Sequence, residues 1–287
     1  MANAFSDAFD DLERKSREQH PVNPDDYIGE DDLLYCGKCH TPKEGWYNFP
    51  LFLGGRQKKP IDCQCQAEAR AAEEAERKKR EHQETVARLK GSGLQDRESW
   101  ECTFDKDDMS NPKLTAICRN YADNFQEMKK MHKGLLFFGP VGTGKTFLAT
   151  CIANQLMEEE RPCKVTNFGR IASEIWNSED KAVYLDSINR YDLLVIDDLG
   201  TERRTEYMDE MVYNLIDSRY RSGLPMVVTT NLTAEQLKNP DSLMMQRIVS
   251  RLMERCNFYP VDGKDRRTKI MIHDFPEVAD ILEKERE

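Results

Sequence analysis

Residues 139–146 read Gly-Pro-Val-Gly-Thr-Gly-Lys-Thr, and they join an apolar run at 135–138 to a segment with helical patterning at 144–159. A G-x-x-x-x-G-K-T sequence between a strand and a helix is the pattern of a phosphate-binding loop. Its glycines let backbone N–H groups surround phosphate oxygens, and the helix N-terminus adds partial positive charge. The alternative is a glycine-rich turn that only joins two elements. We predict a triphosphate site for ATP or GTP, formed by Gly139, Pro140, Val141, Gly142, Thr143, Gly144, Lys145 and Thr146.

Two residues of this loop have individual roles in the predicted site. Lys145 is expected to reach the β- and γ-phosphates, and Thr146 to offer its hydroxyl to Mg²⁺. Residues 193–198, Leu-Leu-Val-Ile-Asp-Asp, predict a buried strand that ends in two carboxylates. We expect Asp197 to bind Mg²⁺, directly or through water, and Asp198 to polarise the attacking water or accept its proton. An ordinary core strand followed by acidic residues is the alternative.

A further strand is predicted at 226–230, and it is followed by Asn231. The amide of Asn231 is a candidate for orienting water against the γ-phosphate. The alternative is that Asn231 caps the helix that follows, because Thr233 and Glu235 also resemble the start of a helix.

Three arginines, Arg247, Arg251 and Arg255, are spaced four residues apart and therefore share one face of a predicted helix at 243–256. A row of guanidinium groups without matching acids is not typical of packing. One of them, with Arg251 as the candidate, could enter the site of a neighbouring subunit as an arginine finger. A nucleic-acid-binding face and a solvated face are the alternatives.

The bulk composition limits the class of protein. The 287 residues contain no basic n-region followed by an apolar h-region and no run of eighteen apolar residues, so we expect a cytoplasmic protein that does not span a membrane. The net charge is −10, but residues 1–32 hold ten carboxylates against three basic side chains. The rest of the chain is nearly balanced, so the total charge does not exclude nucleic-acid binding.

After about residue 94 the chain alternates between short apolar strands and amphipathic helices, which is typical of an α/β fold with a parallel sheet flanked by helices. The expected strands are 135–138, 164–168, 193–196, 226–230 and 269–272, and the main helices are 144–159, 206–222 and 243–256. We predict four parts: an acidic, poorly ordered head with at most short helices at 1–32, a zinc-binding module at 33–66, a charged helix and linker at 67–93 that ends at Gly91-Ser92-Gly93, and a nucleotide-binding domain at 94–287.

Four cysteines form a C-x-x-C and a C-x-C pair, Cys36 with Cys39 and Cys63 with Cys65. Two such pairs supply the four thiolates of a closed tetrahedral Zn²⁺ site, and His40 is a possible substitute ligand. Four unrelated thiols, with one pair redox-active, are the alternative. The other five cysteines lack partner spacing and are expected to be buried, as are Phe168, Trp176 and Tyr191.

The segments Gly-Pro-Val-Gly-Thr-Gly-Lys-Thr, Leu-Leu-Val-Ile-Asp-Asp-Leu-Gly, Val-Val-Thr-Thr-Asn-Leu and Arg-Ile-Val-Ser-Arg-Leu resemble, in order and spacing, replicative-helicase loaders of the DnaC/DnaI type. These belong to the AAA+ class and are related to the IstB transposition helper ATPases. The resemblance covers about residues 100–272. It implies that Arg251 is donated in trans and that Arg267 or Arg266 is the second sensor, although Asp265 replaces the commoner Ser.

The resemblance implies an ATPase that uses ATP and Mg²⁺ and helps to place a hexameric replicative DNA helicase on single-stranded DNA. A finger donated in trans implies head-to-tail self-association into a ring or an open spiral. The zinc-bearing head resembles the loader part that contacts the helicase. A transposition helper that acts on duplex DNA and an adaptor with little nucleotide turnover are the alternatives.

Overall fold

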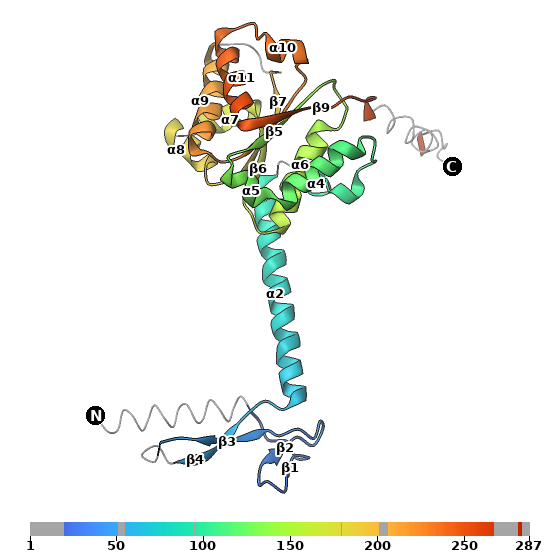
Figure 1. Ribbon diagram of the computed structural model, residues 1–287, viewed down its shortest axis with the longest axis vertical. Helices are drawn as coiled ribbons and strands as arrows, with labels where there is room; N and C mark the ends of the chain where they lie inside the picture. The colour runs from blue at the N-terminus through green and yellow to red at the C-terminus, as the bar shows by residue number, and fades with distance from the viewer. Residues whose placement is uncertain are drawn as a thin grey trace, which may run out of the picture. The chain divides into compact units, whose positions relative to one another are not determined.

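The computed structural model describes residues 20–50, 55–94, 96–178, 180–200, 206–266 and 281–282. The described residues divide into two compact units, and the division falls between His82 and Gln83 (Figure 1). The expected strand at 269–272 and the candidate Arg267 lie outside the described residues, and the acidic head is described only from His20.

The first unit contains two small antiparallel sheets. One pairs β1 (Tyr27–Ile28) with β2 (Leu34–Tyr35), and the other pairs β3 (Glu44–Asn48) with β4 (Arg56–Pro60). Residues 20–32 belong to this unit and are not a separate head, because the Asp26 carboxylate accepts hydrogen bonds from the Lys43 ammonium at 2.5 Å and from the Gly37 N–H at 3.1 Å. Both ionic side chains are about 1% exposed.

Helix α2 (Gln64–Gly93) begins beside the second cysteine pair and is largely exposed over its 30 residues, as its charged composition predicts. The helix ends at Gly93, within the Gly91-Ser92-Gly93 segment where the sequence places its end, and all three residues are helical. Gly93 is buried at a close approach, where a Cβ atom would lie 2.1 Å from the carbonyl oxygen of Cys163. The absence of a side chain at Gly93 therefore permits close packing at the end of the helix.

The second unit contains a five-stranded parallel sheet in the order β6-β7-β8-β5-β9. Its strands are β5 (Gly134–Phe138), β6 (Cys163–Asn167), β7 (Leu193–Leu199), β8 (Met226–Thr230) and β9 (Cys256–Pro260). The first four confirm the predicted strands to within a few residues. The sequence analysis missed β9, which follows the preceding helix directly and has a mixed composition with partly exposed residues.

The helices of this unit are α3 (Arg97–Trp100), α4 (Pro112–Asp123), α5 (Phe125–Lys130), α6 (Lys145–Glu158), α7 (Phe168–Trp176), α8 (Lys181–Ile188), α9 (Glu206–Ser222), α10 (Ala234–Lys238) and α11 (Leu243–Arg255). A short 3-10 turn, η2, covers Phe104–Lys106. None of the described helices has the length and apolar character needed to cross a bilayer.

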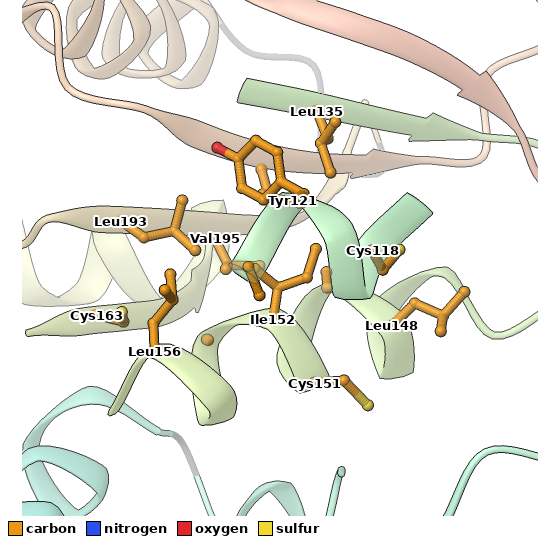
Figure 2. Packing of buried hydrophobic residues seen from close by; sticks show 14 of the residues in the cluster. Cys118, Tyr121, Leu135, Leu148, Cys151, Ile152, Leu156, Cys163, Leu193 and Val195 are labelled. Carbon is orange, nitrogen blue, oxygen red and sulfur yellow. The ribbon is translucent and has the colours of Figure 1, made fainter. Parts of the chain in front are cut away.

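Alternate residues of the central strands enter two separate cores, one on each face of the sheet. On one face, Leu135, Leu193 and Val195 pack against α4 and α6, and Figure 2 shows Tyr121, Ile152 and the neighbouring side chains of these helices around the strands. On the other face, Leu136, Leu194 and Ile196 pack against α7, α9 and α11. This three-layer arrangement buries each central strand on both faces and holds the carboxyl ends of the strands in fixed positions.

Most of the side chains that the sequence analysis assigned to the core are buried. Phe168, Cys118, Cys151, Cys163 and Cys256 are at most 4% exposed, while Cys102 and Tyr191 are partly exposed. Trp176 is a correction, because it lies at the last position of α7 and is 80% exposed. The apolar face of α7 consists of Phe168, Ile171 and Ile175 instead.

Candidate nucleotide site

The predicted phosphate loop connects β5 to α6. Gly144 stands immediately before α6 with φ of 92°, and Gly142 has φ of 75°, so both occupy the left-handed region that a side chain disfavours. These two conformations turn the chain sharply from the sheet into the helix. The first backbone N–H groups of α6 consequently open onto a cleft, which is the geometry that suits a phosphate.

Lys145 is the first residue of α6, and its side chain is only 5% exposed. Its ammonium donates hydrogen bonds to the carbonyl oxygens of Gly139 at 2.8 Å and Pro140 at 2.6 Å. The loop carbonyl groups therefore fix the Lys145 ammonium, and this positive charge lies next to the predicted phosphate position.

Two hydroxyl groups donate hydrogen bonds to the Asp197 carboxylate. Its Oδ1 atom accepts hydrogen bonds from Thr146 Oγ1 at 2.7 Å and from Thr229 Oγ1 at 2.6 Å. Thr146 belongs to the phosphate loop, and Thr229 belongs to β8, the neighbour of β7. The structure thus brings together the two expected magnesium ligands, which are separated by 51 residues in the chain. Sequence reasoning missed Thr229, whose only signal was a hydroxyl near the end of an apolar strand.

Asp198 lies in an irregularity of the sheet. The register of β7 against β8 shifts between Ile196 and Leu199, and Asp198 has φ of 57°, in the left-handed region. A bulge at the end of a strand redirects the side chain that it carries. The Thr229 hydroxyl accepts a hydrogen bond from the Asp198 N–H at 2.9 Å, and the Asn231 amide donates to Asp198 Oδ1 at 3.2 Å.

The start of α10 excludes one of the two interpretations of Asn231. Helix α10 is capped by Thr233, whose hydroxyl accepts from the Gln236 N–H while the Gln236 side chain accepts from the Thr233 N–H. Asn231 is therefore not the helix cap. It faces Asp198 at the site.

These groups line one cleft with a volume of 510 Å³. Its wall consists of the phosphate loop from Val141 to Lys145, Thr146 and Phe147, the strand ends at Asp197, Asp198 and Asn231, and Lys106, Asp108 and Arg266 from outside the sheet. The sequence analysis did not anticipate Lys106 or Asp108. They follow a segment with no phosphate-binding pattern, and only the fold brings them to the cleft.

Arg266 reaches the cleft from the C-terminal side. Its backbone N–H donates a hydrogen bond to the Gly142 carbonyl oxygen at 2.9 Å. Its guanidinium lies 3.2 Å from carboxylate oxygens of both Asp107 and Asp108. Asp265 and Arg266 also approach the loop so closely that a Cβ atom at Gly142 or Gly144 would collide with them. Of the two second-sensor candidates, Arg266 is at the cleft, and Arg267 lies outside the described residues.

Arg251 does not contribute to the described wall of this cleft. It lies on α11, and its guanidinium donates to Asp217 Oδ1 at 2.8 Å and to the Tyr213 hydroxyl at 2.8 Å, both from α9. The expectation that the three arginines lack matching acids is therefore wrong for Arg251. The guanidinium carbon of Arg255 lies over the Tyr220 ring, 4.5 Å from its centre, while Arg247 is exposed.

In the first unit, Cys36, Cys39, Cys63 and Cys65 converge, and their Sγ atoms all lie within 4.8 Å of one another. The Sγ atom of Cys65 is 3.6 Å from that of Cys36 and 3.4 Å from that of Cys63. Zinc bound by four thiolates at about 2.3 Å requires sulfur separations of about 3.8 Å, so this donor set fits a tetrahedral metal site. His40 is outside the set, and its Nδ1 atom lies 3.3 Å from the Tyr27 hydroxyl.

A parallel sheet with a phosphate loop, an acidic strand end and a polar neighbouring strand defines a nucleotide-binding protein of the AAA+ class. Residues 68–273 match the family model of the IstB-like ATP binding protein. This match covers most of the chain, and the chain belongs to that family.

Individual relatives agree with this assignment. The replicative helicase loader DnaI of Bacillus subtilis (strain 168) is 27% identical over 181 residues, which are 58% of this chain and 58% of DnaI. The uncharacterized protein YqaM of the same organism is 28% identical over 257 residues, 83% of this chain and 72% of YqaM. A crystal structure of DnaI matches with a TM-score of 0.51 at 24% identity, covering 61% of this chain and 95% of that chain, and shows the shared fold.

Proposed function

We propose that this chain is an ATP-hydrolysing assembly switch that loads a replicative DNA helicase onto single-stranded DNA. The family binds ATP, and relatives in it are named replicative helicase loaders. The observation that carries the proposal is the 2.7 Å hydrogen bond between Thr146 and Asp197, because it joins the phosphate loop to the acidic strand end at one point of the cleft.

The residues of the cleft have distinct tasks in the proposed reaction. Lys145 neutralises charge on the β- and γ-phosphates, and Thr146 and Asp197 would hold Mg²⁺. Bound Mg²⁺ would supply positive charge against the phosphates at this position. Asp198 accepts the proton of the attacking water, and Asn231, which contacts Asp198 in the structure, orients that water. Arg266 supplies a second cation on the C-terminal side of the cleft.

A complete site needs a contribution from a second subunit. Arg251 is held away from the cleft of its own chain, by Asp217 and Tyr213. We assign to it the finger that enters the cleft of a neighbouring chain, which implies a head-to-tail ring or open spiral. ATP then favours the assembled state, and hydrolysis favours release. The four-cysteine site is assigned to structural Zn²⁺, in the unit that contacts the helicase.

An ATPase assay with the full chain tests this proposal, carried out with and without single-stranded DNA and the replicative helicase of the same host. We expect ATP turnover that responds to these partners, co-purification with the helicase, and at least a tenfold loss of nucleotide affinity in Lys145→Ala. The matched control is Lys130→Ala, since Lys130 is an exposed lysine paired with Glu127 on α5. Absence of nucleotide binding would refute the site. Turnover stimulated by duplex DNA and a transposase, without helicase binding, would favour the transposition helper instead.

A further inference from the structure

The hairpin of β3 and β4 presents aromatic and basic side chains together on the surface of the first unit. Trp46 is 38% exposed and Tyr47 is 46% exposed, although both belong to a β-strand. The partner strand β4 reads Arg-Gln-Lys-Lys-Pro and contains three cations and no acid. Neither the nucleotide cleft nor the cysteine cluster uses these side chains.

The register of the hairpin places cations beside the indole ring. Trp46 is opposite Lys58, and Asn48 is opposite Arg56, so Trp46, Arg56 and Lys58 share one face of the two-stranded sheet. The Arg56 guanidinium carbon lies 4.6 Å from the centre of the Trp46 ring, and the Lys58 ammonium lies 5.2 Å from it. On the other face, the Lys59 ammonium lies 5.7 Å from the Phe49 ring.

The acids near the hairpin leave it locally basic. Glu44 is the acid of β3, and its carboxylate accepts a hydrogen bond from the Leu34 N–H at 3.0 Å. Asp32 pairs with Lys58 at 2.7 Å, at the edge of the hairpin. Arg56 is exposed and stacked on the indole, which keeps its planar group extended beside the ring.

Exposed aromatic rings flanked by cations match the chemistry of single-stranded nucleic acid. Bases stack on aromatic side chains regardless of sequence, and neighbouring cations contact the phosphates between the bases. Protein-binding surfaces are also enriched in Trp, Tyr and Arg, but they are depleted in Lys, whereas β4 carries two lysines beside its arginine. On this hairpin the cations lie directly over the aromatic rings, which favours a polyanion that carries flat rings.

We propose that the β3–β4 hairpin binds single-stranded DNA, with a base stacked on Trp46 and with Arg56 and Lys58, on the same face, contacting phosphates. This inference rests on the proposed function, because it takes its ligand from it. It adds a DNA contact in the metal-binding unit, outside the nucleotide-binding unit. The loader would then hold the strand by a surface that does not depend on the bound nucleotide.

The fluorescence of Trp46 tests the contact directly. The chain contains three tryptophans, and replacing the other two in Trp100→Phe/Trp176→Phe leaves Trp46 as the reporter. Addition of a dT oligomer to this zinc-loaded variant should quench the remaining emission, at the same oligomer concentrations at which the unmodified chain binds by anisotropy. Unchanged Trp46 emission at saturating oligomer would overturn the proposal.

A charge series in the otherwise unmodified chain provides an independent test. The variant Arg56→Gln/Lys58→Gln should weaken dT binding about tenfold and reduce the slope of log K against log salt by about 1.4, because each phosphate contact contributes about 0.7. The matched control is Arg77→Gln/Lys78→Gln, which removes one arginine and one lysine from the exposed part of α2. Zinc content and melting temperature verify that both variants are folded.

The outcomes separate this proposal from the proposed function. If the unmodified chain binds no single-stranded DNA, the loading function itself fails. If it binds DNA while the hairpin variant equals the control, only the hairpin assignment fails. Loss of helicase co-purification with unchanged DNA affinity in the hairpin variant would also overturn the assignment, because the surface would then be a protein contact.

Discussion

Single side chains in this molecule are held in place by contacts within the protein. Arg251 is the clearest case. Its guanidinium makes hydrogen bonds to Asp217 and Tyr213 and lies 4.6 Å from the centre of the Tyr213 ring. Asp217 is 11% exposed in its side chain and also pairs with Arg221. Because these three contacts already restrain the Arg251 side chain, it loses little conformational entropy when it binds a phosphate.

Asp217→Asn should therefore reduce ATP turnover in the assembled protein. Loss of the charge loosens Arg251, and a misplaced catalytic group costs about tenfold to a hundredfold in rate. The KM for ATP should change little, because an arginine finger stabilises charge that develops in the transition state and adds little to ground-state binding. Steady-state kinetics above the assembly concentration measure both quantities. Arg221→Gln, which removes the exposed partner of Asp217, is the control, and equal turnover in the two variants would contradict the assigned positioning role.

A second prediction at this scale concerns Asp107, whose side chain is fully buried. It accepts a hydrogen bond from Thr115 Oγ1 at 2.6 Å and pairs with Arg266. Asp107→Ala should lower the free energy of unfolding by about 2 to 3 kcal/mol, because it leaves buried polar partners unsatisfied. Asp108→Ala should cost about 0.5 kcal/mol, since Asp108 is 42% exposed. Denaturant titration measures the free energy of unfolding of both variants. Equal losses would show that the buried Asp107 carboxylate contributes no more stability than the exposed Asp108 carboxylate.

At the scale of elements, the ends of the strands and helices decide the site. Parallel strands β5, β7 and β8 place their carboxyl ends at one edge of the sheet, and α6 begins at the same edge. The sequence predicts these elements well, because β5 and β7 each contain four consecutive apolar residues, β8 begins with Met-Val-Val, and α6 follows the phosphate loop directly. The prediction fails at β9, whose mixed composition gives no strand pattern and which is defined by its pairing with β5.

The glycines at the end of α2 give a matched pair for an element-scale prediction. A Cβ atom at Gly93 would lie 2.1 Å from the Cys163 carbonyl oxygen, whereas one at Gly91 would meet only Trp100, at 4.0 Å. Gly93→Ala should destabilise the second unit by about 2 kcal/mol or more through overpacking. Gly91→Ala should stabilise it by about 0.5 to 1 kcal/mol, the helix preference of alanine over glycine.

Thermal or denaturant unfolding of the two variants measures this difference. A loss of stability in Gly91→Ala, or a gain in Gly93→Ala, would show that the close approach of α2 to β6 is not as the structure has it.

At the scale of the whole molecule, the two units have separate sources of stability. The second has two hydrophobic cores, while the described residues of the first include few buried apolar side chains and a cluster of four cysteines. A small unit of this kind would depend on a bound metal for much of its folding free energy. Removal of the metal should therefore affect the two units unequally.

Chelation of the native chain should make four additional thiols reactive and leave nucleotide affinity in the second unit unchanged. The thiols of that unit should stay slow, because burial raises the pKa of Cys118, Cys163 and Cys256 to about 12 and leaves little thiolate at pH 8. Thiol titration and nucleotide binding, measured before and after chelation, test this. Four thiols that react equally before and after metal removal would argue against a metal site.

The sequence by itself determined the phosphate loop, the acidic strand end, the cysteine pairs and the parallel sheet, because each depends on short-range spacing that recurs with one local geometry. Only the tertiary structure decided that Arg266 lies at the cleft beside Asp107, 159 residues away in the chain. It also decided that Thr229 joins Asp197, that Arg251 is paired with Asp217, and that Gly93 packs within α2. Contacts between distant residues follow from how the layers pack, and local residue patterns do not encode that packing.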